Sequence, residues 1–120
     1  MKEMILERKY GWSDREYYSD ITRLLDSQCA LKEKPKHFKN YIYDSRDLWD
    51  KHTIAICIPG RTVGEINIDD NDKILNVDID KVLIGENNWY KEDVNEELKK
   101  FIGMKVVFPE IRTENKNIQV

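Results

Sequence analysis

A chain of 120 residues, of which 40% are hydrophobic, has the length and composition of one small domain with a single modest core. The charged fraction is 36% but mixed in sign, and the formal net charge of -3 argues against a protein that coats nucleic acid by bulk attraction. No apolar run is long enough for a membrane span or a signal peptide, so we expect a cytoplasmic protein. The domain is expected to occupy residues 1–110, with a frayed polar tail at residues 111–120.

The first part of the chain predicts a short strand followed by a helix. Residues 4–6 indicate the strand. The helix is predicted over residues 13–28, because Ser13 and Glu16 have the spacing of a capping box, in which each side chain bonds the other residue's free amide. The predicted apolar stripe of this helix consists of Tyr17, Ile21, Leu24 and Leu25.

The middle of the chain predicts an antiparallel meander. Residues 37–43 are rich in strand formers and follow a lysine-rich loop at residues 31–39. Residues 53–58, TIAICI, form an apolar run typical of a strand that is covered on both faces. A tight Pro59-Gly60 turn and then an acidic turn join this run to two further strands, predicted at residues 62–68 and 74–80.

The hairpin within residues 61–85 predicts one apolar and one polar face, because successive strand side chains point to opposite sides. The apolar face is expected to contain Gly64, Ile66, Ile68, Leu75, Val77 and Ile79. The opposite face is expected to contain Val63, Glu65, Asn67, Asn76, Asp78 and Asp80, with Asp69, Asp70 and Asp72 in the turn.

A second helix is predicted to begin at Asp93, which forms a capping box with Glu96. Gly103 lies where a C-terminal cap is common, and residues 104–108 predict a last strand before Pro109. The buried stripe of this helix is expected to be Val94, Leu98, Phe101 and Ile102. Together the elements predict an α+β fold, with an antiparallel β-meander sheet and two α-helices packed on one face.

No residue pattern indicates a common catalytic or zinc site, and no cofactor is expected. Cys29 and Cys57 lack the CxxC or Cys/His spacing of a zinc site and are expected to be buried thiols in a reducing compartment. His37 and His52 are the general bases closest to neutral pH, but no nucleophile accompanies them in a typical motif.

Two alternatives remain open. Glu65, Asp78 and Asp80 could bind a divalent metal for phosphodiester chemistry, provided that the two strands bring them together. The basic stretch at residues 32–46 also contains Phe38, Tyr41 and Tyr43, a combination found in single-stranded nucleic-acid-binding modules. Acidic residues interrupt this stretch, however, and nucleic acid is the less favoured partner.

The strongest signal is the charge of the segment from Glu65 to Glu97, which contains 11 acidic and 3 basic residues. Like charges on one sheet face repel each other, so such a face is better explained by a basic partner that neutralises it. Aromatic side chains in a neighbouring loop are typical interface anchors. The candidate partner-binding residues are therefore Glu65, Asn67, Asp69, Asp70, Asp72, Asn76, Asp78, Asp80, Glu86, Trp89 and Tyr90.

The run GEINIDDNDKILNVDID, followed by YKEDVNEELKKFIGMKVVF, resembles the small bacterial immunity proteins of contact-dependent growth inhibition systems. The resemblance covers the second half of the chain and rests on an acidic hairpin, an Asp-Val-Asn helix that ends at Phe-Ile-Gly, and a last strand. It implies a non-catalytic inhibitor that binds the toxin domain of its own system, commonly a nuclease. The resemblance identifies no binding residues in this chain, so the candidate partner-binding residues rest on the charge argument alone.

Overall fold

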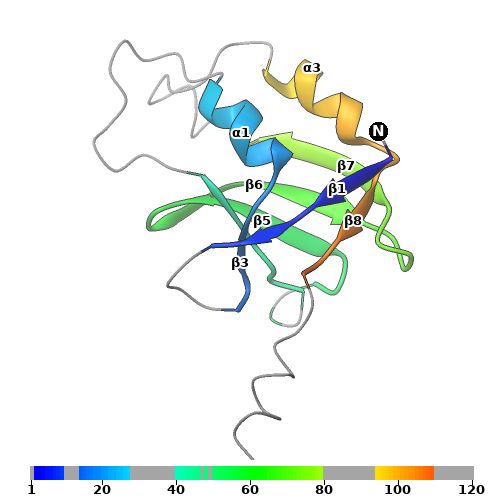
Figure 1. Cartoon of the computed structure of the whole chain (residues 1–120), viewed down its shortest axis with the longest axis horizontal. Helices are drawn as coiled ribbons and strands as arrows, with labels where there is room; N and C mark the ends of the chain where they lie inside the picture. The colour runs from blue at the N-terminus through cyan, green and yellow to red at the C-terminus, as the bar shows by residue number, and fades with distance from the viewer. Residues whose placement is uncertain are drawn as a thin grey trace, which may run out of the picture.

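The computed structural model describes residues 2–9, 14–27, 40–46, 48, 50–79 and 94–109. Six strands within these ranges form one antiparallel sheet, which runs in the order β2 (Glu7–Arg8), β3 (Glu16–Tyr18), β4 (Tyr41–Tyr43), β5 (Thr53–Ile58), β6 (Arg61–Ile68) and β7 (Ile74–Ile79). Two helices, α1 (Asp20–Ser27) and α3 (Val94–Leu98), lie over the same side of this sheet (Figure 1). The predicted α+β class is confirmed.

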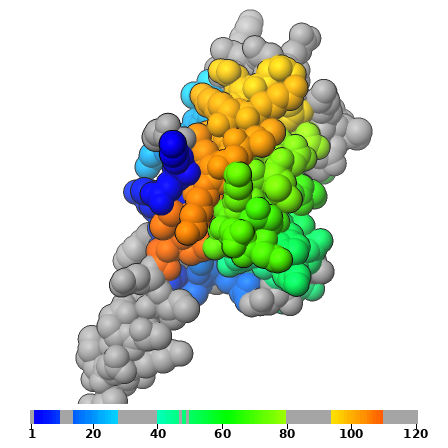
Figure 2. Space-filling view, turned by 90° about the vertical axis from the view of Figure 1, so that its right-hand side faces the viewer, coloured from blue at the N-terminus to red at the C-terminus, as the bar shows by residue number. Residues whose placement is uncertain are grey.

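A parallel pair of strands forms a second, smaller sheet from β1 (Glu3–Ile5) and β8 (Lys105–Val107). Both strands are predicted by the sequence, but their pairing with each other is not. Figure 2 shows β8 between β1 and the hairpin formed by β6 and β7. The Val106 amide donates a hydrogen bond of 2.8 Å to the Asp72 carbonyl oxygen, so β8 connects the turn of this hairpin to the N-terminal strand.

The first helix begins later than predicted. Glu16–Tyr18 form strand β3 instead of the first helical turn, and the expected Ser13 cap lies outside the described residues. Ser19 is the actual cap: its hydroxyl oxygen accepts a hydrogen bond of 3.2 Å from the amide of Ile21. In return the Thr22 hydroxyl oxygen accepts a hydrogen bond of 3.0 Å from the Ser19 amide, which completes a reciprocal capping box.

The core lies between the main sheet and the helices. One row of mutually opposed residues crosses the strands on this side and consists of Tyr17, Ile42, Ile56, Gly64 and Ile79. Ile21 and Leu25 of α1 and Val94 and Leu98 of α3 pack into the same core. Only glycine fits position 64, because a Cβ there would overlap the Asp78 carbonyl oxygen and lie 2.8 Å from the Ile79 Cδ1.

The predicted meander of β5, β6 and β7 is confirmed, but two β-bulges change its alternation. Val63 has no partner opposite it on β5 and is buried, with 1% of its surface exposed. Leu75 has no partner opposite it on β6 and is 56% exposed. The predicted faces of Val63 and Leu75 are therefore both wrong, because the extra residue of a bulge shifts the alternation by one position.

The second helix is short and continues into a 3-10 turn, η1 (Lys99–Phe101). Phe101 is buried as predicted, whereas Ile102 is 46% exposed. A 3-10 turn has three residues per turn instead of 3.6, so Ile102 is rotated away from the predicted buried stripe. Gly103 has a φ of 94°, which confirms the glycine cap.

The segment after α3 also covers the outer edge of β7, the last strand of the main sheet. The Ile74 amide donates to the Met104 carbonyl oxygen, and the Ile74 carbonyl oxygen accepts from the Gly103 amide, each at 2.8 Å. At the other end of β7, the Ile79 amide donates to the Asn95 side chain at 3.1 Å. Pairing of another chain along this edge is therefore obstructed at both ends.

Several predictions fall on residues outside the described ranges: the lysine-rich loop, Cys29, His37, the Asp93 cap and the polar tail. Cys57 is described and is a buried free thiol, as expected. Among the described residues, no helix has the length and apolar character needed to cross a membrane.

Candidate functional site

The hairpin of β6 and β7 divides the predicted binding residues into two described groups. One group lies on the outer face, defined here as the side of the main sheet opposite the helices, and consists of Glu65, Asn67, Asn76 and Asp78. The other group lies in the turn and consists of Asp69, Asp70 and Asp72. The remaining candidates, Asp80, Glu86, Trp89 and Tyr90, lie outside the described residues.

On the outer face, two carboxylates lie directly opposite each other on neighbouring strands. Glu65 pairs with Asp78 in the register of β6 and β7, and both residues are exposed. The Asn67 amide nitrogen donates to the Glu65 carboxylate at 3.1 Å, and the Thr53 hydroxyl donates to the Asn67 side-chain oxygen at 3.3 Å. Asn67 thus positions Glu65, whereas the Asp78 side chain makes no hydrogen bond within the described part of the chain.

The line of opposed residues that contains Glu65 and Asp78 continues beyond the hairpin. Residues opposite one another in the register form a line across the outer face from Glu16 through Tyr43, Ala55 and Glu65 to Asp78. Glu16 and Tyr43 were not among the predicted residues of this face, because the capping pattern placed Glu16 in a helix and Tyr43 was considered as a stacking residue for nucleic acid. The sequence did contain a signal, because the alternation Tyr-Ile-Tyr at residues 41–43 places Tyr43 on the face opposite Ile42. In the structure Ile42 is fully buried and both tyrosines are partly buried.

Tyr41 and Cys57 lie beside this line, and both have raised pKa values. Burial raises the pKa of Tyr41 to about 12, so the phenol stays protonated at neutral pH. Burial also raises the pKa of the Cys57 thiol, which lies 3.7 Å from the Thr62 hydroxyl. A thiol with a raised pKa is a poor nucleophile, so the outer face lacks an activated cysteine at this position.

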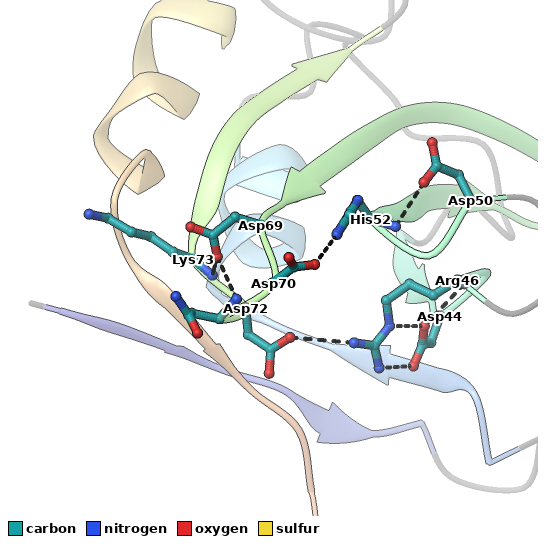
Figure 3. Close-up of polar contacts among 9 residues, drawn as sticks. Asp44, Arg46, Asp50, His52, Asp69, Asp70, Asp72 and Lys73 are labelled. Carbon is teal, nitrogen blue, oxygen red and sulfur yellow. Dashed lines mark hydrogen bonds and ion pairs between the residues drawn. The ribbon is translucent and has the colours of Figure 1, made fainter.

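In the turn, Asp69 stabilises the backbone (Figure 3). One of its carboxylate oxygens accepts hydrogen bonds from the Asn71 amide at 2.8 Å and from the Lys73 amide at 3.0 Å. These two backbone hydrogen bonds lower the pKa of Asp69. Asp72 has a φ of 65°, a left-handed conformation that aspartate tolerates better than most residues.

Asp70 faces a histidine from the start of β5. The His52 Nε2 and the Asp70 carboxylate are 2.7 Å apart, and the hydrogen bond from His52 lowers the pKa of Asp70. The His52 backbone amide donates to Asp50 at 2.9 Å, which holds this loop in place. The Asp70 side chain is 82% exposed, so it remains accessible from solvent.

Asp72 is part of a network with Arg46 and Asp44 at the same end of the sheet (Figure 3). The Arg46 guanidinium donates two hydrogen bonds of 2.8 Å to the Asp44 carboxylate and lies 3.5 Å from Asp72. Burial alone would raise the pKa of Asp44, but the hydrogen bonds and charge of Arg46 outweigh it and the pKa is lowered. The guanidinium carbon also lies 4.1 Å from the centre of the Phe108 ring.

The acidic residues differ in the partners that they contact within the protein. Asp72 shares the Arg46 guanidinium with Asp44, Asp69 accepts two backbone hydrogen bonds, and Asp70 contacts His52, so each carboxylate of the turn has a partner within the protein. Glu65 and Asp78 keep exposed charges with no cation bonded to either within the described residues. Among the described residues of the predicted surface, Glu65 and Asp78 are therefore the carboxylates that accept no hydrogen bond from a basic side chain or a backbone amide.

The geometry of the described residues also bears on the metal alternative. No group of three histidine, cysteine, aspartate or glutamate side chains among them is arranged to bind a metal ion. Asp80, the third ligand of the alternative metal site, lies outside these ranges. His52 contacts a carboxylate and not a hydroxyl or thiol, so this contact is not a nucleophile-activating pair.

No protein-family model matches the chain, and comparisons with curated proteins and with solved structures likewise give no match.

Proposed function

We propose that this chain is a non-catalytic inhibitor that acts in the cytoplasm and neutralises a basic protein toxin, in the manner of an immunity protein. The acidic outer face of the β6 and β7 hairpin would cover the positively charged surface of the toxin. The observation that carries this proposal is the direct opposition of Glu65 and Asp78 on an exposed sheet face.

The opposition of these carboxylates has an energetic consequence. Like charges directly opposite each other on a sheet destabilise the pair, on a scale of roughly 0.2–1 kcal/mol for cross-strand interactions. A lysine or arginine of a partner placed between Glu65 and Asp78 would remove this repulsion and form charge-assisted hydrogen bonds with both. The free protein therefore carries a small strain that binding of a basic partner relieves.

The arrangement of the sheet favours recognition by side chains. The edge of β7 is occupied at Ile74 and Ile79 by hydrogen bonds from the segment after η1 and from α3, so strand addition there is disfavoured. The outer face instead presents the exposed pair Glu65 and Asp78. Complementary charge accelerates association and selects the partner, which suits an inhibitor that must capture a toxin quickly.

A nuclease is the toxin class that best fits this surface. A nuclease must present lysine and arginine side chains to the phosphates of its substrate, so its binding cleft is basic. An acidic protein face can occupy the same cleft and exclude the substrate without chemistry of its own. The resemblance of residues 64–80 and 90–108 to immunity proteins of contact-dependent growth inhibition systems supports the same choice.

Growth protection tests the proposed function. The C-terminal domain of the protein encoded immediately upstream of the gene for this chain is expressed from an inducible promoter, with and without this chain. We expect the domain to stop growth alone and co-expression of the chain to restore it. A harmless domain, or a toxic one that this chain does not neutralise, would overturn the proposal.

A further inference from the structure

Leu75 is an apolar side chain on an otherwise polar part of the outer face. It is 56% exposed and lies next to Asn76, which pairs with Asn67 across the hairpin. Its neighbours on the core side, Ile74 and Val77, are 1% and 4% exposed. Leu75 is therefore excluded from the core that the residues around it help to build.

The β-bulge is the cause of this placement. In a regular strand, Leu75 and Val77 would lie on the same side, because side chains alternate with a period of two. Asn67 is paired with Asn76 and Ile68 with Ile74, so Leu75 is the extra residue and both Leu75 and Asn76 are exposed. Bulges often redirect a side chain towards a functional surface.

We propose that Leu75 is the apolar anchor of the binding surface and inserts into an apolar pocket of the basic partner. Glu65 and Asp78 would then pair with lysine or arginine side chains at the rim of that pocket. This inference rests on the proposed function, and it specifies the chemistry of the partner: an apolar depression bordered by cations.

The charges on this face and the usual composition of protein interfaces both favour a partner with an apolar pocket bordered by cations. Protein interfaces place an apolar residue at the centre, where water is excluded, and polar or charged residues around it. The described neighbours of Leu75 on this face are the amides of Asn67 and Asn76 and, farther along the strands, the carboxylates of Glu65 and Asp78. Lys73 is two residues away, in the turn, whereas the charged residues that the register places on this face of the hairpin are Glu65 and Asp78.

Affinity measurements on three single variants test this inference. The probe is the same upstream-encoded C-terminal domain, inactivated at its catalytic site, and binding is measured by calorimetry. Leu75→Ala is expected to weaken binding about 10- to 100-fold, the range of an interface hot spot. Leu75→Met, which conserves volume and apolar character, is expected to stay within about threefold of the wild type. Ile5→Ala is the matched control, because Ile5 is 58% exposed but lies on β1 in the other sheet.

The outcomes separate this inference from the proposed function. Binding by the wild type and Leu75→Met, with a selective loss in Leu75→Ala, supports the anchor. Wild-type binding that Leu75→Ala leaves unchanged, or that Ile5→Ala weakens equally, overturns the anchor and leaves the proposed function standing. A wild-type chain that fails to bind the domain overturns both.

Discussion

Replacing Val63 with alanine removes two methyl groups from a side chain that is 1% exposed, whereas Leu75→Ala shortens one that is 56% exposed. Each buried methylene-sized group contributes about 0.8 kcal/mol, and the cavity left behind adds to the loss. Val63→Ala is therefore expected to lower the free energy of unfolding by about 2–3 kcal/mol. Leu75→Ala removes a larger group but is expected to change it by only about 0.5 kcal/mol, as for other exposed positions.

Urea unfolding followed by circular dichroism measures both variants against the wild type. With a slope of about 1–3 kcal/mol per molar urea, Val63→Ala should lower the midpoint by roughly 1 M and Leu75→Ala by roughly 0.3 M or less. The slope itself should stay constant, because neither change alters the surface exposed on unfolding. The opposite ranking would mean that the hairpin alternates without bulges, and it would refute the placement of both residues.

The packing of Gly64 and the contacts of Arg46 give two further predictions. Gly64→Ala should cost about 1–3 kcal/mol of stability in the same urea assay, because the new Cβ would overlap the Asp78 carbonyl oxygen; wild-type stability would contradict this packing. Arg46→Met should cost about 1–3 kcal/mol at pH 7, because Asp44 is 8% exposed and would lose both hydrogen bonds from the guanidinium. Because the Asp44 pKa is lowered in the folded protein, its contribution is present above the unfolded value of about 4 and is lost as the pH falls through the folded pKa. Unfolding at pH 7 and pH 3 should therefore show a smaller acid destabilisation in Arg46→Met than in the wild type, and equal losses would exclude this role of Arg46.

Local sequence patterns were sufficient for the centre of the main sheet. The apolar run at residues 53–58 matches β5, and the alternating runs after it match β6 and β7 to within one residue at each end. These elements are joined by short turns, so their order and antiparallel pairing follow from chain connectivity. The buried stripe of Val94, Leu98 and Phe101 was also predicted correctly, because it depends only on the spacing of residues along a helix.

Long-range contacts account for most of the differences. Residues 16–18 form a strand because Tyr17 pairs with Ile42, a partner 25 positions away that outweighs a local capping signal. The parallel pairing of β1 with β8 joins the two ends of the described chain, and no local pattern encodes it. The bulges at Val63 and Leu75 depend on the register between strands, which a periodic pattern cannot specify.

The composition of the candidate surface was predictable from the sequence, but its internal contacts were not. Charge counting selected the hairpin as the candidate surface, and the alternation correctly placed Glu65 and Asp78 on one face. Neither of these patterns could show that Arg46 lies 3.5 Å from Asp72, a residue 26 positions later in the chain. Nor could they show that His52 contacts Asp70. Both contacts depend on how the segment between β4 and β5 packs against the turn.

The outer-face carboxylates are proposed to bind a basic partner, and a matched pair of charge-reversal variants tests this binding. The first double variant, Glu65→Lys with Asp78→Lys, changes the outer face. The second, Glu3→Lys with Glu97→Lys, makes the same change in net charge at exposed positions on β1 and α3. Circular dichroism confirms that each variant is folded before binding to the inactivated upstream-encoded domain is measured.

Calorimetry at low and high salt then gives the affinities. We expect the outer-face variant to lose at least about 100-fold in affinity at low salt, and the control to lose less than about fivefold. The wild-type affinity should also fall as salt rises, because exposed charges are screened. Equal losses in the two variants, or wild-type affinity in the outer-face variant, would contradict the claim that Glu65 and Asp78 form the binding surface.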